Sequence, residues 1–221
     1  MDRRQFLLRS LSVVGVASVG VLAACTPTRE NPMPSATDDP AAAPTTPALT
    51  CRVLVAYFSR PGENYYYGDR VTLETGNTHV VADMIAAEAA VDVYRIEATD
   101  PYPEDYEETV ARNVREENSN ARPAIAGALP DVVQYDMILL GSPVWNVQTP
   151  MIMRTFVESV DLAGKTVHPF VTYAVSGIGR VEDDYRRLCP DAILGESLAV
   201  QGEEATQARP AVEAWLARIG L

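Results

Sequence analysis

Three polar or aromatic segments each follow an apolar run, and the first contains residue types that suit an anion. It joins Ser59-Arg60 to Gly76-Asn77-Thr78 across an insertion. Hydroxyls, an amide and glycines at a helix start let backbone N–H groups and the helix dipole face a phosphate. Neither a Gly-Lys-Ser/Thr loop nor a Gly-x-Gly-x-x-Gly fingerprint is present. Taken alone, this segment fits a polar connection that ends in an N-cap equally well.

The second and third segments suit a planar ligand. Gly141 to Asn146 places Trp145 beside a proline, where its flat apolar face is available. A tryptophan is more often part of a core, but the end of a predicted strand favours the ligand interpretation. The third segment, 172–179, contains glycines that permit positive φ and expose backbone donors, which could bind the carbonyl and imide edge of a ring. No side chain has a defined partner as acid, base or nucleophile, so we assign no catalytic residue.

Short apolar runs alternate with amphipathic segments, and this alternation must position the three segments. Continuously apolar strands indicate a parallel sheet that is covered on both faces. We predict strands at 52–58, 92–98, 137–142, 166–174 and 192–200, and helices at 78–90, 104–118, 149–160, 181–189 and 205–219. The pattern predicts an α/β domain with a doubly wound, five-stranded parallel sheet. Ligands of such domains bind beyond the carboxyl ends of the strands, just after residues 58, 142 and 174.

The same motifs resemble the flavodoxin-like family, in its branch of bacterial flavodoxin-like lipoproteins. The resemblance covers residues 51–221 and implies a sheet order of 2-1-3-4-5 and one non-covalent FMN. By position in the motifs, it implies a phosphate site at Ser59, Arg60, Asn77 and Thr78, ring contacts from Pro143, Val144, Trp145 and Asn146, and contacts to the far edge of the ring from Ser176, Gly177 and Gly179. Two features depart from the family pattern. Residues 63–75 split the phosphate site, and Tyr173-Ala174-Val175 replace the histidine and glycines that are common there.

The N-terminal residues predict an export signal followed by a tether. Residues 1–24 have a twin-arginine start at Arg3-Arg4, then an apolar run too short to span a bilayer comfortably. Leu22-Ala23-Ala24-Cys25 resembles a lipobox, so we expect Cys25 to be lipidated; an ordinary membrane helix is the alternative. Residues 26–50 contain six prolines and few large apolar side chains, which predicts a disordered linker over 25–50. The folded domain is then 51–221.

Composition limits the classes of function. The 221 residues include 18 basic and 30 acidic side chains, a formal charge of −12, which argues against nucleic-acid binding and favours cationic partners. Three cysteines and two histidines predict neither a disulfide scaffold nor a metal site.

We therefore expect an extracytoplasmic FMN protein, attached to a bacterial membrane only through its lipid, that transfers electrons. The partner is a redox protein or a small planar electron acceptor. A carrier is favoured over an NAD(P)H- or quinone-dependent FMN reductase. A flavin-free module that binds a ligand or a protein is the alternative from another class.

Overall fold

The computed structural model describes residues 51–221. The predicted signal peptide of residues 1–24, the linker of residues 25–50 and the lipidation of Cys25 lie outside the described residues. Among the described residues, no helix combines the length and the apolar composition that are needed to cross a membrane.

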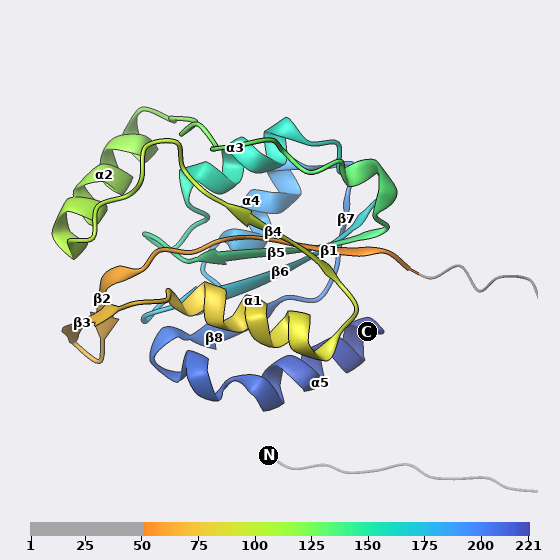
Figure 1. The fold of residues 1–221 in the computed structure, drawn as a ribbon. Coiled ribbons are helices and arrows are strands. Elements are labelled where there is room, and N and C mark those ends of the chain that lie inside the picture. The colour runs from red at the N-terminus through yellow and green to blue at the C-terminus, as the bar shows by residue number, and fades with distance from the viewer. Residues whose placement is uncertain (1–50) are drawn as a thin grey trace, which may run out of the picture. The chain divides into compact units, whose positions relative to one another are not determined.

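The centre of the domain is a parallel sheet whose strand order matches the expectation. Its strands run in the order β4 (Asp92–Ile96), β1 (Val53–Phe58), β5 (Met137–Pro143), β6 (Thr166–Tyr173), and the last two, β7 (Ile193–Leu194) and β8 (Leu198–Gln201), both pair with β6. This is the order 2-1-3-4-5 with its fifth strand in two pieces. Figure 1 shows the strands side by side with helices on both faces.

The break in the last strand has a local cause, although the sequence predicted one strand over 192–200. At Gly195 an added Cβ would lie 2.2 Å from the His168 ring, so only glycine allows this close approach. The carbonyl of Glu196 then lies 2.9 Å from Nδ1 of His168 and accepts from Nε1 of Trp215 at 3.1 Å. The interruption thus satisfies two buried side chains.

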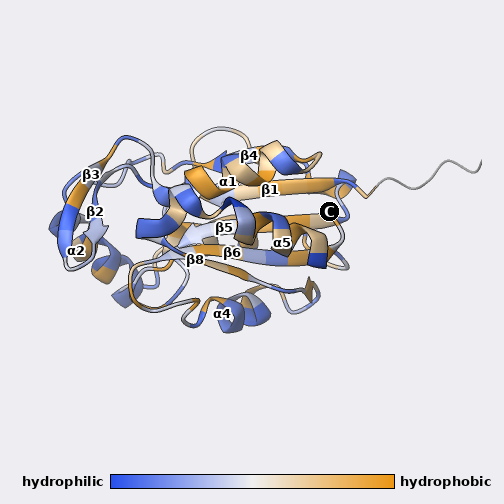
Figure 2. Ribbon diagram, turned by 90° about the horizontal axis from the view of Figure 1, so that it is seen from below, coloured by the Kyte–Doolittle hydropathy of each residue, from blue (hydrophilic) through white to orange (hydrophobic). Residues whose placement is uncertain are grey.

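The described residues form five α-helices, four of which cover the two faces of the sheet and bury alternate residues of β1 in separate cores. They are α1 (Asn77–Glu88), α2 (Tyr106–Asn118), α3 (Met151–Ser159), α4 (Val181–Leu188) and α5 (Arg209–Ile219), with short 3₁₀ helices η1 (Val132–Gln134) and η2 (Gly202–Gln207). Val53, Val55 and Tyr57 pack with α1 and α5, whereas Leu54, Ala56 and Phe58 belong to the core under α3 and α4. Both faces of β1 are buried, which explains its continuous apolar sequence (Figure 2).

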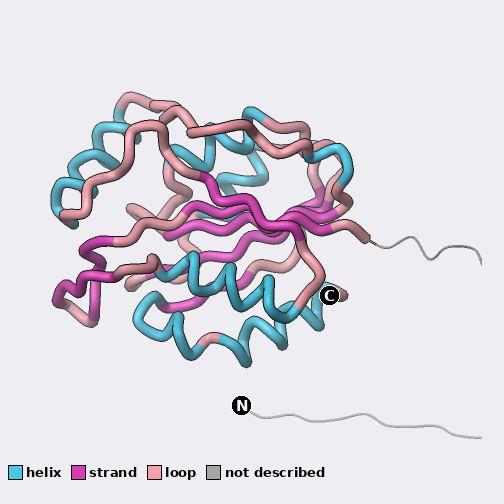
Figure 3. Tube along the Cα trace, in the orientation of Figure 1, coloured by secondary structure: helices cyan, strands magenta, loops and turns pink. Residues whose placement is uncertain are grey.

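Residues 62–73, which the sequence indicates only as an insertion, form a β-hairpin. Strand β2 (Gly62–Tyr66) pairs antiparallel with β3 (Asp69–Leu73), apart from the main sheet (Figure 3). The turn has positive φ at Tyr67 and Gly68, 47° and 95°, as a two-residue type I′ hairpin requires. The N–H of Glu63 donates to the carbonyl of Glu104 at 2.8 Å, so the hairpin is joined to the segment that precedes α2.

Two of the helix starts that differ from the predicted ones have a local explanation. The N-cap of α1 is Gly76 rather than Asn77 or Thr78, and Ser59 Oγ from the loop after β1 accepts the N–H of His79 at 3.1 Å. At the other end of the chain, the predicted helix 205–219 divides into η2 and α5. Helix α5 begins just before Pro210, a residue type that favours the first turn.

Candidate functional site

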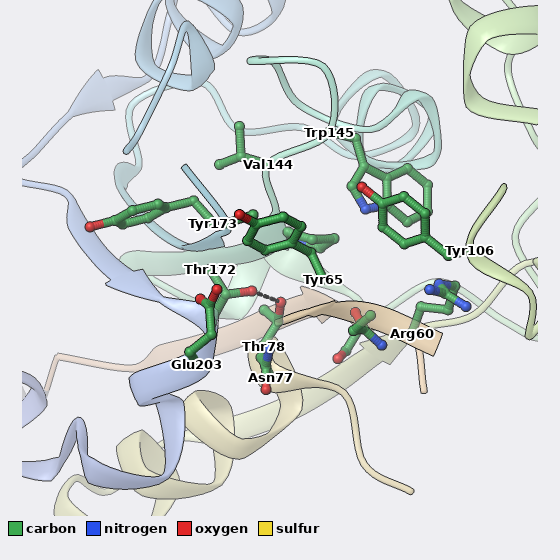
Figure 4. A pocket seen from close by; sticks show the side chains of 15 residues that line it. Arg60, Tyr65, Asn77, Thr78, Tyr106, Val144, Trp145, Thr172, Tyr173 and Glu203 are labelled. Carbon is green, nitrogen blue, oxygen red and sulfur yellow. Dashed lines mark hydrogen bonds between the residues drawn. The ribbon is translucent and has the colours of Figure 1, made fainter. Parts of the chain in front are cut away.

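A pocket opens at the carboxyl edge of the sheet, where the loops after β1, β5 and β6 meet the hairpin and η2 (Figure 4). Seven of the eleven residues predicted to bind a cofactor line it: Ser59, Arg60, Asn77, Thr78, Pro143, Val144 and Trp145. The structure therefore brings the first two predicted segments together across an insertion that separates them in sequence. Asn146, Ser176, Gly177 and Gly179 do not line this pocket.

The amino end of α1 forms one wall and is chemically open. The first turn of α1 contains no acidic residue, and in the described part of the chain the backbone N–H groups of Asn77 and Thr78 have no acceptor. An added Cβ at Gly76 would lie 2.4 Å from both the Arg60 carbonyl oxygen and Ser59 Oγ, so the two halves of the split segment touch only because residue 76 is glycine. Unpaired N–H groups and the positive end of the helix dipole favour an anion here.

Hydroxyl groups complete this wall. Oγ1 of Thr78 and Oγ1 of Thr172 lie 2.7 Å apart, which links α1 to the end of β6. Both threonines are buried, with exposed fractions of 1% and 4%. The hydrogen bond between them fixes the first turn of α1 against the sheet, so the open N–H groups have a defined direction.

Arg60 was predicted to bind the phosphate, but in the structure its guanidinium bonds to backbone carbonyls. Its Nη1 donates to the carbonyls of Pro103 and Glu104, each at 2.9 Å, and its Nη2 donates to the carbonyl of Glu63. Burial lowers the pKa of the guanidinium, and the neighbouring Tyr106 and Glu63 oppose this shift. The arginine lines the pocket, but its donors join the hairpin to the loop before α2.

Trp145 stands at the start of a tight turn whose conformation is strained. Trp145 and Gln148 exchange two backbone hydrogen bonds of 3.1 and 3.0 Å, and φ is positive at Asn146 and Val147, 47° and 60°. This is a type I′ turn with a β-branched residue where one is rarely found. The Trp145 ring makes edge contacts with Phe58 and Tyr102, at centroid distances of 5.5 and 5.1 Å, which fix its orientation.

The third predicted segment is divided between two roles: its first residues, 172–174, line the pocket, whereas its glycines support this turn. The carbonyl of Val147 accepts the N–H of Arg180 at 2.7 Å. An added Cβ at Gly179 would lie 2.3 Å from the same carbonyl oxygen, so this approach needs a glycine, and φ is +58° at both Gly177 and Gly179. Asn146 points elsewhere, because its Nδ2 donates to Oε2 of Glu117 at 2.6 Å.

Several lining residues were not among the predicted ones. They come from the hairpin, from α2 and from the ends of β6 and β8: Asn64, Tyr65, Tyr106, Thr172, Tyr173, Ala174, Gly202 and Glu203. In Figure 4, Tyr65 lies in the middle of the pocket, between Tyr173 and Tyr106. Glu203 Oε1 accepts the N–H of Tyr67 at 3.0 Å, whereas Oε2 is buried and has no partner among the described residues. The switch-point rule pointed to the loops after residues 58, 142 and 174 and not to the end of the last strand, so only the fold shows that Glu203 reaches the pocket.

Comparisons with known proteins agree with this architecture. The family model described as Flavodoxin matches residues 52–219. A crystal structure from Bacteroides eggerthii, assigned as a flavoprotein, is 30% identical and has a TM-score of 0.63, with 78% of this chain and 99% of that chain covered. A second, from Bacteroides uniformis, is 29% identical with a TM-score of 0.60, covering 76% and 98%.

A flavoprotein from Lactobacillus acidophilus, solved in complex with FMN, shares the fold. It is 17% identical and has a TM-score of 0.52, with 72% of this chain and 98% of that chain covered. The comparison with curated proteins gives no match. Because the family model spans most of the chain, the protein belongs to the flavodoxin family, as its motifs predicted.

Proposed function

We propose that the pocket binds FMN non-covalently and that the protein transfers electrons outside the cytoplasm, anchored through a lipid on Cys25. The observation that carries the proposal is the open amino end of α1, which faces a pocket shared with Trp145. Family membership and the FMN complex of the Lactobacillus acidophilus relative support the choice of cofactor.

The residues present fit the phosphate of FMN. Among the described residues, the N–H groups of Asn77 and Thr78 are unpaired, so they are available as donors. Because the first turn of α1 contains no acid, the helix end keeps its partial positive charge. Hydrogen bonds to a charged group each contribute about 1.5–3 kcal/mol. The close contact between Gly76 and Ser59 brings the loop after β1 to the same place. We assign Arg60 to the support of the loop, since three of its five N–H donors bond to backbone carbonyls.

The residue types of the remaining lining suit a sugar-alcohol chain and a flat ring, but the cavity is only about 90 Å³, so binding requires Tyr65, in the middle of the pocket, to move aside. The unpartnered Oε2 of Glu203 is an acceptor for a hydroxyl of the ribityl chain. Trp145, held by Phe58 and Tyr102, offers a fixed aromatic face, and Val144 adds apolar surface. FMN, when bound, supplies the redox chemistry, and the side chains orient the ring and exclude water from it.

Flavin content tests the cofactor. The full-length chain, purified from the cells that make it, is expected to be yellow and to release FMN, not FAD, on denaturation. FMN added to the stripped protein is expected to lose its fluorescence. A colourless chain that also leaves the fluorescence of added FMN unchanged would refute the proposal.

Fractionation tests the location. Cys25→Ser should release the protein from the membrane into the soluble extracytoplasmic fraction. Lysine at both Arg3 and Arg4 should block export, because the export receptor reads paired arginines. If Cys25→Ser stays with the membrane, or the double lysine variant is exported normally, the proposed anchor and route are wrong.

Anaerobic reduction tests the electron-transfer role. A carrier should keep its flavin oxidised for many minutes in NADH or NADPH and still be reduced by dithionite. Its reduction by a basic protein partner should slow as salt screens the acidic surface. Rapid bleaching by a nicotinamide nucleotide would instead make the protein a reductase.

A further inference from the structure

A second groove lies beside the proposed flavin pocket, between α2 and the turn that follows β5. Its volume is about 300 Å³, at the lower end of the range for small-molecule sites. Trp145, Val144 and Tyr106 line both spaces, whereas Asn77 and Thr78 line only the main pocket. A molecule in this groove would therefore be a neighbour of the flavin site and would leave the phosphate site free.

Helix α2 is rich in charged residues, but the wall that it contributes to the groove is apolar. Val110 and Val114 are one turn apart and are 39% and 42% exposed. Across the groove, Val144 and Trp145 continue this surface. Apolar side chains that remain in contact with water beside an aromatic ring are typical of a surface that binds an apolar ligand.

One buried polar atom in the wall has no partner. Asn113 is 5% exposed, and its Nδ2 donates to Oε1 of Glu117 at 2.7 Å. The same carboxylate accepts from Asn146 through Oε2, so it takes both amide NH₂ groups and fixes their orientation. The Oδ1 of Asn113 is therefore turned away from Glu117, is buried, and has no donor among the described residues. A buried acceptor left unpaired is costly, and a ligand O–H that reaches Oδ1 after a small shift of the Asn113 side chain toward the groove would remove that cost.

The charges around the groove favour a neutral ligand. The Glu117 carboxylate lies within the wall's hydrogen-bond network and would repel an anion. The guanidinium of Arg60, which also lines the groove, donates to neutral backbone carbonyls and keeps its positive charge, so it offsets the charge of Glu117 and the groove favours neither sign. The shape of the groove, its apolar surface and the free acceptor together suit a ligand that is a flat neutral ring with an O–H group.

We propose that this groove binds a neutral phenolic ring whose hydroxyl donates to Oδ1 of Asn113. The further proposal that this ligand exchanges electrons with the flavin rests on the proposed function. Hydroquinones are the redox-active members of this class. A hydroquinone and its quinone differ by two electrons and two protons, which FMN, when bound, would be able to exchange with the molecule in the groove.

Equilibrium dialysis of two matched ligands tests the groove without measuring turnover. The full-length chain, first without and then with saturating FMN, is dialysed against 2-naphthol or against 2-methoxynaphthalene, which lacks the O–H. The expected preference for 2-naphthol is about tenfold or more, because only this ligand satisfies Oδ1 of Asn113. FMN should not displace it, because the groove does not include Asn77 or Thr78.

Two variants and one control locate the site. Asn113→Leu should lower the affinity for 2-naphthol to that for 2-methoxynaphthalene. Val114→Trp, on an exposed part of the wall, should fill the groove and weaken both ligands about tenfold or more. Val133→Trp makes the same change at a residue that is 78% exposed on η1 and does not line the groove, so binding should stay the same. FMN titration of each variant shows whether it is folded.

The outcomes separate this inference from the proposed function. Equal affinity for the two ligands, unchanged affinity in Val114→Trp, or displacement of 2-naphthol by FMN would each overturn the phenolic site while leaving FMN binding intact. If the chain fails to bind FMN, the flavin function is wrong, whatever 2-naphthol does. If the chain binds 2-naphthol but not FMN, the phenolic site is supported, but its ligand is not an electron partner of a flavin.

Discussion

Helices α1 and α2 both begin beside the pocket, but their amino ends are treated in opposite ways. Helix α2 neutralises its own: Asp105 accepts the N–H of Glu108 at 2.8 Å, and two glutamates stand in the first turn. Helix α1 has Gly76 as its cap and no first-turn acid. The same partial positive charge is therefore cancelled within the chain at α2 and left for an external anion at α1. A helix start is informative about function when its acids are missing.

The largest expected effect comes from making α1 resemble α2. Asn77→Asp places a carboxylate in the first turn of α1, where it would repel a phosphate and compete for the same N–H groups. We expect FMN affinity to fall by about two to three orders of magnitude. Stability without FMN should rise by about 0.3–1 kcal/mol, because the new charge favours the helix end.

Fluorescence titration and urea unfolding measure these two changes. Asn118→Asp is the matched control, because it makes the same change of charge at the last residue of α2. It should leave FMN affinity within about twofold, as expected for a screened distant charge. If Asn77→Asp binds FMN as the wild type does, the α1 end is not the phosphate site.

The next effect distinguishes the two roles of Arg60. Arg60→Met removes the guanidinium donors to the carbonyls of Pro103, Glu104 and Glu63, although Pro103 keeps Thr109 Oγ1 and Glu104 keeps the N–H of Glu63 as donors. We expect the free energy of unfolding to fall by about 2–4 kcal/mol. FMN affinity, measured at a temperature where the variant is folded, should fall less than tenfold. A loss of affinity like that of Asn77→Asp, with stability unchanged, would restore Arg60 as a phosphate ligand.

The family resemblance supplied more of the fold than of the site. The continuously apolar run 53–58 and the β-α alternation were enough to predict the sheet, since both faces of β1 are buried. The type I′ turn at Tyr67-Gly68 could be recognised as a hairpin only from paired backbone. Gly179 was predicted to contact the cofactor. A glycine in the sequence indicates that a neighbour comes close, but it does not show which neighbour. In the structure that neighbour is Val147.

Side chains whose partners are distant in sequence could not be assigned. Arg60 is an arginine beside an expected phosphate site, and nothing in its local sequence shows that the carbonyls of Pro103 and Glu104 take its donors. Glu203 reaches the pocket only because the last strand ends beside β6 and η2 turns back toward the hairpin. Spacing along the chain predicts which loops converge, whereas hydrogen-bond partners depend on the packed structure.

A smaller effect is expected at the amino end of α2. Asp105→Ala removes the side chain that accepts the N–H of Glu108, which should lower the free energy of unfolding by about 1 kcal/mol. FMN affinity should stay within about twofold, because this end does not bind the cofactor. Urea unfolding and FMN titration of the same preparation give both values. A variant with greatly altered FMN affinity would show that the two helix ends are not independent.

The smallest expected effect on stability is at Glu158, whose carboxylate pairs with Arg122 and not with a helix end. A hydrogen bond from Arg122 lowers the pKa of Glu158, against a smaller opposing effect of burial. The folded-state pKa is depressed, so this stabilisation is present above the unfolded pKa and is lost as pH falls through the folded value. Because the pair is partly exposed, it contributes only a few tenths of a kcal/mol. Unfolding of Glu158→Gln and wild type should differ slightly at pH 7 and converge at low pH; a constant difference would exclude this titration.

The most direct test of the central claim compares FMN with riboflavin, which has the same ring and ribityl chain but no phosphate. If the open amino end of α1 is a phosphate site, the stripped wild-type protein should bind FMN about a hundredfold or more tightly than riboflavin, because two or more hydrogen bonds to a charged group are lost. Asn77→Asp should remove most of that difference. Equal affinity of the wild-type protein for the two flavins would show that the amino end of α1 is not a phosphate site.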